Sequence, residues 1–168
     1  MKSLITIDGN LLRNDRVEVA GHQANCQNTF GSGIARTIRE MYPTAYEADT
    51  LAARDGSNHL GNFSYADIPL NHRKDGSRLH RIYNLYGQNL YGKGTRQTNY
   101  DALYTALEGM RYDIEQTYLN TCPSIGFPYK MGSDRGGGSW DVVSRLIEVA
   151  FDGYEGEVLI YRLNQPVP

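Results

Sequence analysis

Residues 124–150 read SIGFPYKMGSDRGGGSWDVVSRLIEVA. The run from Ser124 to Pro128 is short and apolar, which is typical of a buried central strand. A glycine-rich polar loop follows, and Ser139 can cap a helix after it. That helix carries a wide apolar stripe formed by Val142, Val143, Leu146, Ile147 and Ala150. The stretch predicts a strand, a loop and a helix in succession, the unit of α/β layered domains.

A second segment repeats this construction. Residues 25–35 read NCQNTFGSGIA and lead into a helical pattern over 34–41, which Pro43 ends. Glycines let main chain approach a ligand closely, and free N–H groups at a helix start favour an anion. Either loop alone indicates a tight turn, but the pair indicates a grip on two phosphates. Neither loop is a Walker sequence or a good GxGxxG fingerprint, which disfavours an ATPase or an ordinary dehydrogenase.

The rest of the chain alternates strands and helices. We expect strands at 2–7, 16–20, 79–86 and 157–163, with loops and short edge strands over 56–77. Thr44 and Glu47 form a capping-box pattern for a helix to about Arg54, and Thr98 with Asp101 caps the strongest helix. The sequence predicts one domain over 1–168, with an α/β/α three-layer fold and a mixed sheet of about six strands.

Composition limits the partners. The 168 residues carry a net charge of −2, which provides no broad basic field for nucleic acid. No apolar run approaches the length of a membrane span, and two cysteines suit a reducing compartment. The four histidines lack metal-ligand spacing. We therefore expect a cytoplasmic monomer without a metal, a cofactor, a membrane or a nucleic acid partner.

Four motifs in this order resemble a known family. They are GNLL at 9–12, NCQNTFGSGIA at 25–35 before a helix ending in YP, IYNLYGQ at 82–88, and FPYKMGSDRGGGSWDVVSRLIEVAF at 127–151. The chain resembles a macro domain, the ADP-ribose-binding module, from residue 3 to 163. It looks most like the branch of terminal ADP-ribose protein glycohydrolases, DNA ADP-ribosyl glycohydrolase antitoxins and yeast-type ADP-ribose-1''-phosphate phosphatases.

The resemblance implies a set of ligand contacts. Near adenine it implies Gly9, Asn10 and Leu11, where Asn10 replaces the usual aspartate. Around the distal ribose and diphosphate it implies Asn25, Gly31, Ser32, Gly33, Ile34, Ala35, Lys130, Met131, Gly132, Ser133, Arg135, Gly136, Gly137 and Gly138. Trp140 and Tyr161 match positions of core or adenine-side packing.

The resemblance also implies a catalytic set of Asp134, Asn28 and Gln88. Asp134 matches the family's catalytic aspartate, whereas the family's lysine falls on Gln88, which cannot form a Schiff base. Lys93, five residues later, is a weak substitute. The leading function is hydrolysis of ADP-ribose-1''-phosphate or an ADP-ribosyl ester, with Asp134 as general base for water. The alternatives are a module that binds without turnover and, more weakly, a nucleic-acid ADP-ribosyl glycohydrolase.

Several single residues keep two interpretations. Asp134 is either a catalyst or an ordinary loop aspartate that pairs with Arg135 or caps a turn. Of the histidines, His22 alone is placed to reach the ligand, and Cys26 is expected to be a small buried residue. The tyrosines at 83, 86, 91 and 100 either pack a rim or stack on a base. The basic group Arg73, Lys74, Arg78, His80 and Arg81 is either a solvated hairpin or a nucleic-acid contact.

Overall fold

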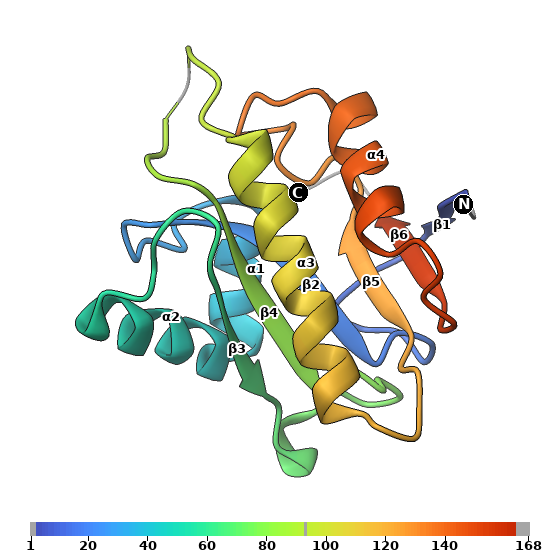
Figure 1. The fold of residues 1–168 in the computed structure, drawn as a ribbon. Coiled ribbons are helices and arrows are strands. Elements are labelled where there is room, and N and C mark those ends of the chain that lie inside the picture. Colours follow the sequence, from blue (N-terminus) through green and yellow to red (C-terminus); the bar gives the residue numbers. More distant parts are fainter. Residues whose placement is uncertain (1–2, 93, 164–168) are drawn as a thin grey trace.

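The computed structural model describes residues 3–92 and 94–163, which form six strands, four α-helices and one short 3₁₀ helix (Figure 1). The strands are β1 (Ile5–Asp8), β2 (Val19–Asn25), β3 (Phe63–Asp67), β4 (Arg81–Gln88), β5 (Ile125–Pro128) and β6 (Val158–Arg162). The helices are α1 (Gly33–Met41), α2 (Pro43–Asp55), α3 (Tyr100–Thr117) and α4 (Trp140–Ala150), with the 3₁₀ turn η1 at Leu70–His72.

The strands form one mixed sheet in the order β1-β6-β5-β2-β4-β3. All neighbouring strands are parallel except the edge strand β3, which runs antiparallel to β4. The carboxyl ends of β2, β4 and β5 therefore meet at one edge of the sheet, where an α/β fold forms its ligand crevice. The predicted mixed sheet of six strands is confirmed.

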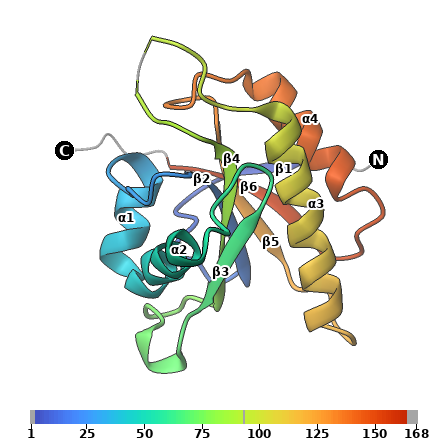
Figure 2. The same ribbon diagram turned by 60° about the vertical axis from the view of Figure 1, so that its left-hand side comes forward.

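Helices cover both faces of the sheet. Figure 2 shows α1 and α2 on one face and α3 and α4 on the other. Side chains of successive strand residues enter opposite cores: Leu159 packs with the α1–α2 cluster, and the next residue, Ile160, packs with the α3–α4 cluster. This double burial accounts for the mostly apolar residues of β5 and β6, and the helices on both faces (Figure 2) confirm the three-layer α/β/α fold.

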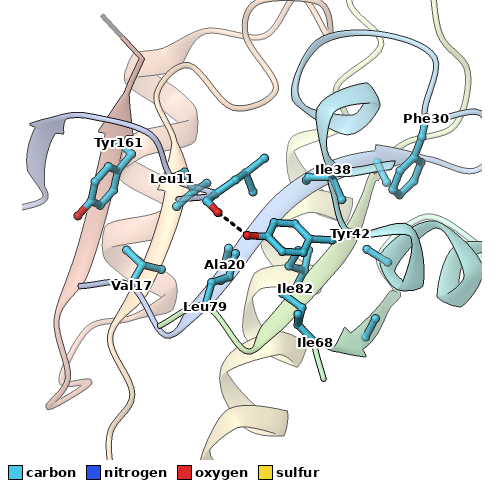
Figure 3. Packing of buried hydrophobic residues seen from close by; sticks show 14 of the residues in the cluster. Leu11, Val17, Ala20, Phe30, Ile38, Tyr42, Ile68, Leu79, Ile82 and Tyr161 are labelled. Carbon is cyan, nitrogen blue, oxygen red and sulfur yellow. Dashed lines mark hydrogen bonds between the residues drawn. The ribbon is translucent and has the colours of Figure 1, made fainter. Parts of the chain in front are cut away.

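The core under α1 is closed by a hydrogen bond across the fold. The Tyr42 hydroxyl donates to the Leu12 carbonyl at 2.6 Å, beside Ile38 and Ile82 (Figure 3). Tyr42 is the last residue before α2, and Leu12 follows β1. The bond fixes the turn between α1 and α2 and so helps to set the direction of α1.

Four expectations about element ends need correction. The strand expected at 16–20 is β2 at Val19–Asn25, because Asn14 Oδ1 accepts the N–H groups of Arg16 and Val17 in a turn. Helix α2 begins at Pro43, so Thr44 caps nothing. Asn99, rather than Thr98, caps α3 by accepting the Ala102 N–H at 3.0 Å. Ser139 lies at the N-cap of α4 without a side-chain cap bond.

The basic group from 73 to 81 is not one surface. Arg81 is buried and forms ion pairs with Asp67 at 2.7 Å and Asp113 at 3.3 Å. Arg78 pairs with Glu18, and Arg73 donates to the Ile68 carbonyl. Over residues 3–92 and 94–163, no helix is both long and apolar enough to cross a membrane.

Candidate functional site

A cavity of about 620 Å³ opens at the carboxyl ends of β2, β4 and β5. Its walls come from the loop between β2 and α1, the first turn of α1, the end of β4, and the loop between β5 and α4. Loops that are far apart in the sequence meet here because the parallel strands before them end at the same edge.

The first wall is the start of α1. Gly33 has φ +59°, a conformation that side chains rarely adopt, and Ser32 precedes it in extended conformation. The Ser32 side chain makes no capping hydrogen bond, and the first turn contains no acidic residue. The N–H groups of a first helical turn have no partner within their own helix, and they carry partial positive charge. Ile34 and Ala35 line the cavity with this turn, so the wall favours an anion.

The second wall is the loop between β5 and α4, which is closed on itself. The Gly132 carbonyl accepts the Gly138 N–H at 2.9 Å and the Thr98 hydroxyl at 2.6 Å. The Gly136 carbonyl accepts the N–H groups of Gln97 and Thr98 at 2.8 and 3.0 Å. The segment before α3 therefore holds the loop at Gly132 and at Gly136, and the loop is preorganised before any ligand arrives.

Gly136 is required by close packing. A Cβ atom on this residue would lie 2.3 Å from Thr98 Oγ1, 2.7 Å from the Gly132 carbonyl oxygen and 3.0 Å from Gln23 Nε2. No side chain fits there without moving the loop. The glycine run of the sequence thus reflects a tight crossing of main chain, and not only turn conformation.

Side-chain amides connect the two strands beside the loop. Gln23 Nε2 donates to Gln88 Oε1 at 2.7 Å and to Thr98 Oγ1 at 2.9 Å, and Gln88 Nε2 donates to the Leu90 carbonyl at 2.7 Å. Both ends of the Gln88 amide are thus hydrogen-bonded, whereas the buried Gln23 Oε1 has no protein partner. Gln88 lines the cavity as a neutral, anchored group.

Asp134 faces the cavity from the second wall. It is exposed, and over the described residues no hydrogen bond or ion pair engages its carboxylate. The predicted alternative, an ion pair with Arg135, is not formed. Arg135 instead extends across the opening. Its Nε lies 3.7 Å from the point that a Cβ atom would occupy if Gly33 carried a side chain. Arg135 therefore brings a positive charge to the start of α1, and Asp134 keeps its oxygens available for a water molecule or a substrate hydroxyl.

The structure brings most of the predicted site residues together. The predicted residues that line the cavity are Asn25, Gly31, Ser32, Gly33, Ile34, Ala35, Gln88, Lys130, Met131, Gly132, Asp134, Arg135 and Gly136. Gly137 lines an adjoining hollow, whereas Gly138 and Ser133 support the loop without lining either space. Lys93 lies outside the described residues.

Asn28 does not face the cavity. Its Nδ2 donates to Asp49 Oδ2 at 2.7 Å and to Thr50 Oγ1 at 3.2 Å, both on α2. Asp49 is fully buried and also accepts the Tyr86 hydroxyl at 2.7 Å. Asn28 has φ +56° and satisfies a buried carboxylate, so its side chain anchors the first glycine loop to α2.

The residues after β1 also lie apart from the cavity lining. Asn10 is exposed, and its Oδ1 accepts the Leu12 N–H at 2.9 Å. Leu11 is buried against Gly126, and Gly9 lies against the Tyr161 ring. Figure 3 shows the Leu11 and Tyr161 side chains in this cluster. Since β1 is parallel to β6 and β6 to β5, these residues share the edge of the sheet where the cavity opens.

His22 and Cys26 contribute no reactive group to the site. His22 is buried beside Phe30, its Nε2 lies 2.7 Å from Asn84 Oδ1, and burial lowers its pKa to about 4. It does not line the cavity, so the expected reach to the ligand is not seen. Burial, together with nearby Asp49, raises the pKa of the Cys26 thiol to about 11. Over the described residues, no group of three potential metal ligands comes together.

Sequence reasoning missed several lining residues and misplaced some tyrosines. Of the four tyrosines expected at the cleft, Tyr91 lines it, while Tyr83 and Tyr86 are core residues. The missed lining residues are Gln23, Ala24, Gly92, Pro128 and Tyr129, whereas Thr29 and Phe30 belong to the loop from Asn28 to Ala35 that was expected to wrap the ligand. Pro128 and Tyr129 lie at the end of the strand predicted at 124–128, and this position was the available signal, because strand ends share one edge of the sheet. Gln23 and Ala24 carried no such signal, because the strand before them was predicted to end at residue 20.

Known proteins provide an independent comparison of the fold. No family model matches the chain. A curated relative, the uncharacterized 17.5 kDa protein of the tk-vs intergenic region of Enterobacteria phage T4, is 27% identical over 130 residues, which is 76% of each chain.

Solved structures cover nearly the whole chain. The DarG macrodomain of Thermus aquaticus is 23% identical with a TM-score of 0.73, covering 96% of this chain and 98% of that one. The DarG macrodomain of Mycobacterium tuberculosis is 24% identical with a TM-score of 0.73, covering 95% and 98%. Thermosipho africanus DarTG, solved in complex with ADP-ribose, is 15% identical with a TM-score of 0.73, covering 91% of this chain and 40% of that one. The described chain therefore has the macrodomain fold.

Proposed function

We propose that the protein binds ADP-ribose or a close derivative, with the diphosphate between the first turn of α1 and the loop between β5 and α4. The observation that carries the proposal is the meeting of these two anion-favouring segments across one cavity, with Arg135 extending from one toward Gly33 of the other. The volume of about 620 Å³ is in the usual range for a small-molecule site. The complex of Thermosipho africanus DarTG with ADP-ribose gives further support, because that chain shares the fold.

The strand order suggests how the ligand would run. Gly9, Asn10 and Leu11 follow β1, which lies on the opposite side of β5 and β2 from β4. If adenine meets the β1 end, the distal ribose would lie toward the end of β4, near Gln88 and Asp134. Asn10 would have to release its bond to the Leu12 N–H, or share that oxygen, to accept a bond from the adenine amino group.

The activity that best suits the site is hydrolysis of ADP-ribose-1''-phosphate or of an ADP-ribosyl ester. For the phosphate, Asp134 would take a proton from a water whose oxygen attacks phosphorus. The bond between phosphorus and the ribose oxygen would break, and protonation of that oxygen would give ADP-ribose and inorganic phosphate. Main-chain N–H groups of the two walls would stabilise the charge that develops on the phosphoryl oxygens.

Gln88 favours a second candidate, a module that binds the nucleotide without turnover. Its amide is neutral and hydrogen-bonded at both ends, so it provides no nucleophile and no proton. The same observation argues against the weaker candidate, glycohydrolase chemistry on nucleic acid.

A substrate panel separates these functions. The wild type, Asp134→Ala and the control Asp75→Ala are incubated with ADP-ribose-1''-phosphate, an ADP-ribosyl ester and ADP-ribosylated DNA. Asp75 is also an exposed loop aspartate, but it does not line the cavity. We expect Asp134→Ala to lose a factor of about 10² or more in rate while Asp75→Ala retains wild-type activity. Binding of ADP-ribose without product from any substrate would refute hydrolysis and support the binding module.

A further inference from the structure

A second hollow of about 430 Å³ adjoins the cavity, and we call it the side basin. It lies between the loop after β4, with Thr95 and Arg96, and the loop between β5 and α4, with Gly137. It shares Gly92, Asp134 and Arg135 with the main cavity. Asp134 is therefore at the junction of two spaces, and a substrate that reacts beside it has room on both sides of the reacting bond.

The side basin has an excess of positive charge. Its charged lining residues within the described chain are Arg96, Arg135 and Asp134, two cations against one carboxylate. Neither arginine forms an ion pair with a described carboxylate, and both are exposed. This differs from Arg16, Arg36, Arg78 and Arg162, which are also exposed but pair with acidic side chains. An anion in the side basin would thus meet guanidinium groups that it need not detach from another partner.

The side chain of Arg96 is held in place by the ring of Tyr100. Its guanidinium carbon lies 4.5 Å from the centroid of the Tyr100 ring, and the Tyr100 hydroxyl accepts the Ser139 N–H at 2.8 Å. The next two residues of the chain donate their N–H groups to the Gly136 carbonyl, which fixes the backbone beside Arg96. A guanidinium stacked on a ring keeps the N–H groups along its edge for a second partner, and phosphate oxygens match that edge.

We propose that the side basin binds a phosphate group that the substrate carries beyond Asp134, and that Arg96 is the residue that selects for it. The inference rests on the proposed function, because it takes the nucleotide to occupy the main cavity. It narrows that function to substrates whose far side is a phosphate, and it disfavours an ester linked to a protein side chain. A terminal phosphate and the backbone of a nucleic acid strand share this chemistry.

The experiment compares ligands in variants that do not turn over. Asp134→Asn serves as the background, and calorimetry measures the affinity for ADP-ribose, ADP-ribose-1''-phosphate, an ADP-ribosylated oligonucleotide and an ADP-ribosylated peptide. We expect Arg96→Gln to weaken binding of a phosphate-bearing ligand by about fivefold without changing the affinity for ADP-ribose. The difference in affinity between Arg96→Gln and the background protein should decrease as the salt concentration rises. If Arg96→Gln weakens the binding of ADP-ribose-1''-phosphate, the side basin takes a terminal phosphate. If it weakens the binding of the oligonucleotide, the side basin takes the phosphate of a nucleic acid strand.

Arg39→Gln is the matched control. Arg39 is also exposed and lies 4.0 Å from the centroid of a tyrosine ring, that of Tyr46, but it lines neither space. It should leave all four affinities unchanged. The inference is overturned if Arg96→Gln has no effect, acts equally on all ligands, or acts most on the peptide. If the background protein does not bind ADP-ribose at all, the proposed function fails first, and the two failures are therefore distinguishable.

Discussion

Replacing Gly136 by alanine should destabilise the protein and disorder the second wall of the cavity. The added Cβ would lie 2.3 Å from Thr98 Oγ1 and 2.7 Å from the Gly132 carbonyl oxygen, which is closer than real Cβ contacts allow. Thr98 would have to move, so its hydrogen bond to Gly132 would be lost together with the bond from Gln23. Overpacking costs about 1–3 kcal/mol and each of the two lost hydrogen bonds about 1 kcal/mol, so we expect a loss of about 3–5 kcal/mol.

Denaturant unfolding of the wild type, Gly136→Ala and Gly31→Ala measures this loss. Gly31 lines the same cavity, but a Cβ there would meet nothing within 4 Å. Gly31→Ala should therefore unfold within about 0.5 kcal/mol of the wild type, or slightly above it. ADP-ribose affinity should fall in Gly136→Ala because the loop carbonyls and N–H groups lose their positions. Equal stability of Gly136→Ala and the wild type would refute the account of the loop as a tight crossing.

Three further outcomes test the buried groups. The pKa of His22 is lowered to about 4 in the folded protein, so the unfolded chain binds a proton more readily than the folded one. The contribution of neutral His22 to the free energy of unfolding is therefore fully present above about pH 6.5 and is lost as the pH falls to about 4. His22→Gln should show about 3 kcal/mol less acid destabilisation than the wild type in denaturant melts at pH 7 and pH 4. Asn28→Ala should cost about 1–3 kcal/mol in the same melts, because it leaves the buried Asp49 short of a donor, and a change in catalytic rate at constant stability would contradict this role. Cys122 is exposed, whereas Cys26 has a pKa raised to about 11, so a thiol reagent at pH 8 should label Cys122 quickly and Cys26 slowly, and equal rates would be inconsistent with the burial of Cys26.

The sequence predicted the layers well because burial patterns repeat along it. The apolar stripe on α4 and the apolar residues of β4 and β5 can be recognised in the local sequence, so these elements were predicted without knowledge of their tertiary contacts. The sequence failed where polar side chains are satisfied by distant partners. β2 contains His22 and Gln23, which pair with Asn84 and Gln88 on β4, so a buried strand looked polar and was assigned too early in the chain.

For the candidate site too, the sequence predicted the position of the glycine loops but not the contacts of single side chains. The composition of these loops predicted a grip on two phosphates, because each loop follows a strand and precedes a helix, and the family resemblance implied the individual residues. Of these, residues 31–35, 130–132 and 134–136 line one cavity. The roles of single side chains could not be predicted. Thr98 appeared to be a helix cap but secures the Gly132 carbonyl, and Asn28 appeared to be catalytic but pairs with Asp49. Such roles depend on contacts across 21 or more residues, which local patterns do not encode.

A crystal structure of the protein soaked in ADP-ribose tests the central claim most directly. The account predicts that both phosphates lie between the N–H groups of Gly33, Ile34 and Ala35 and the loop from Gly132 to Gly136. A nucleotide bound elsewhere, or a saturating soak that leaves these residues without ligand, would contradict it.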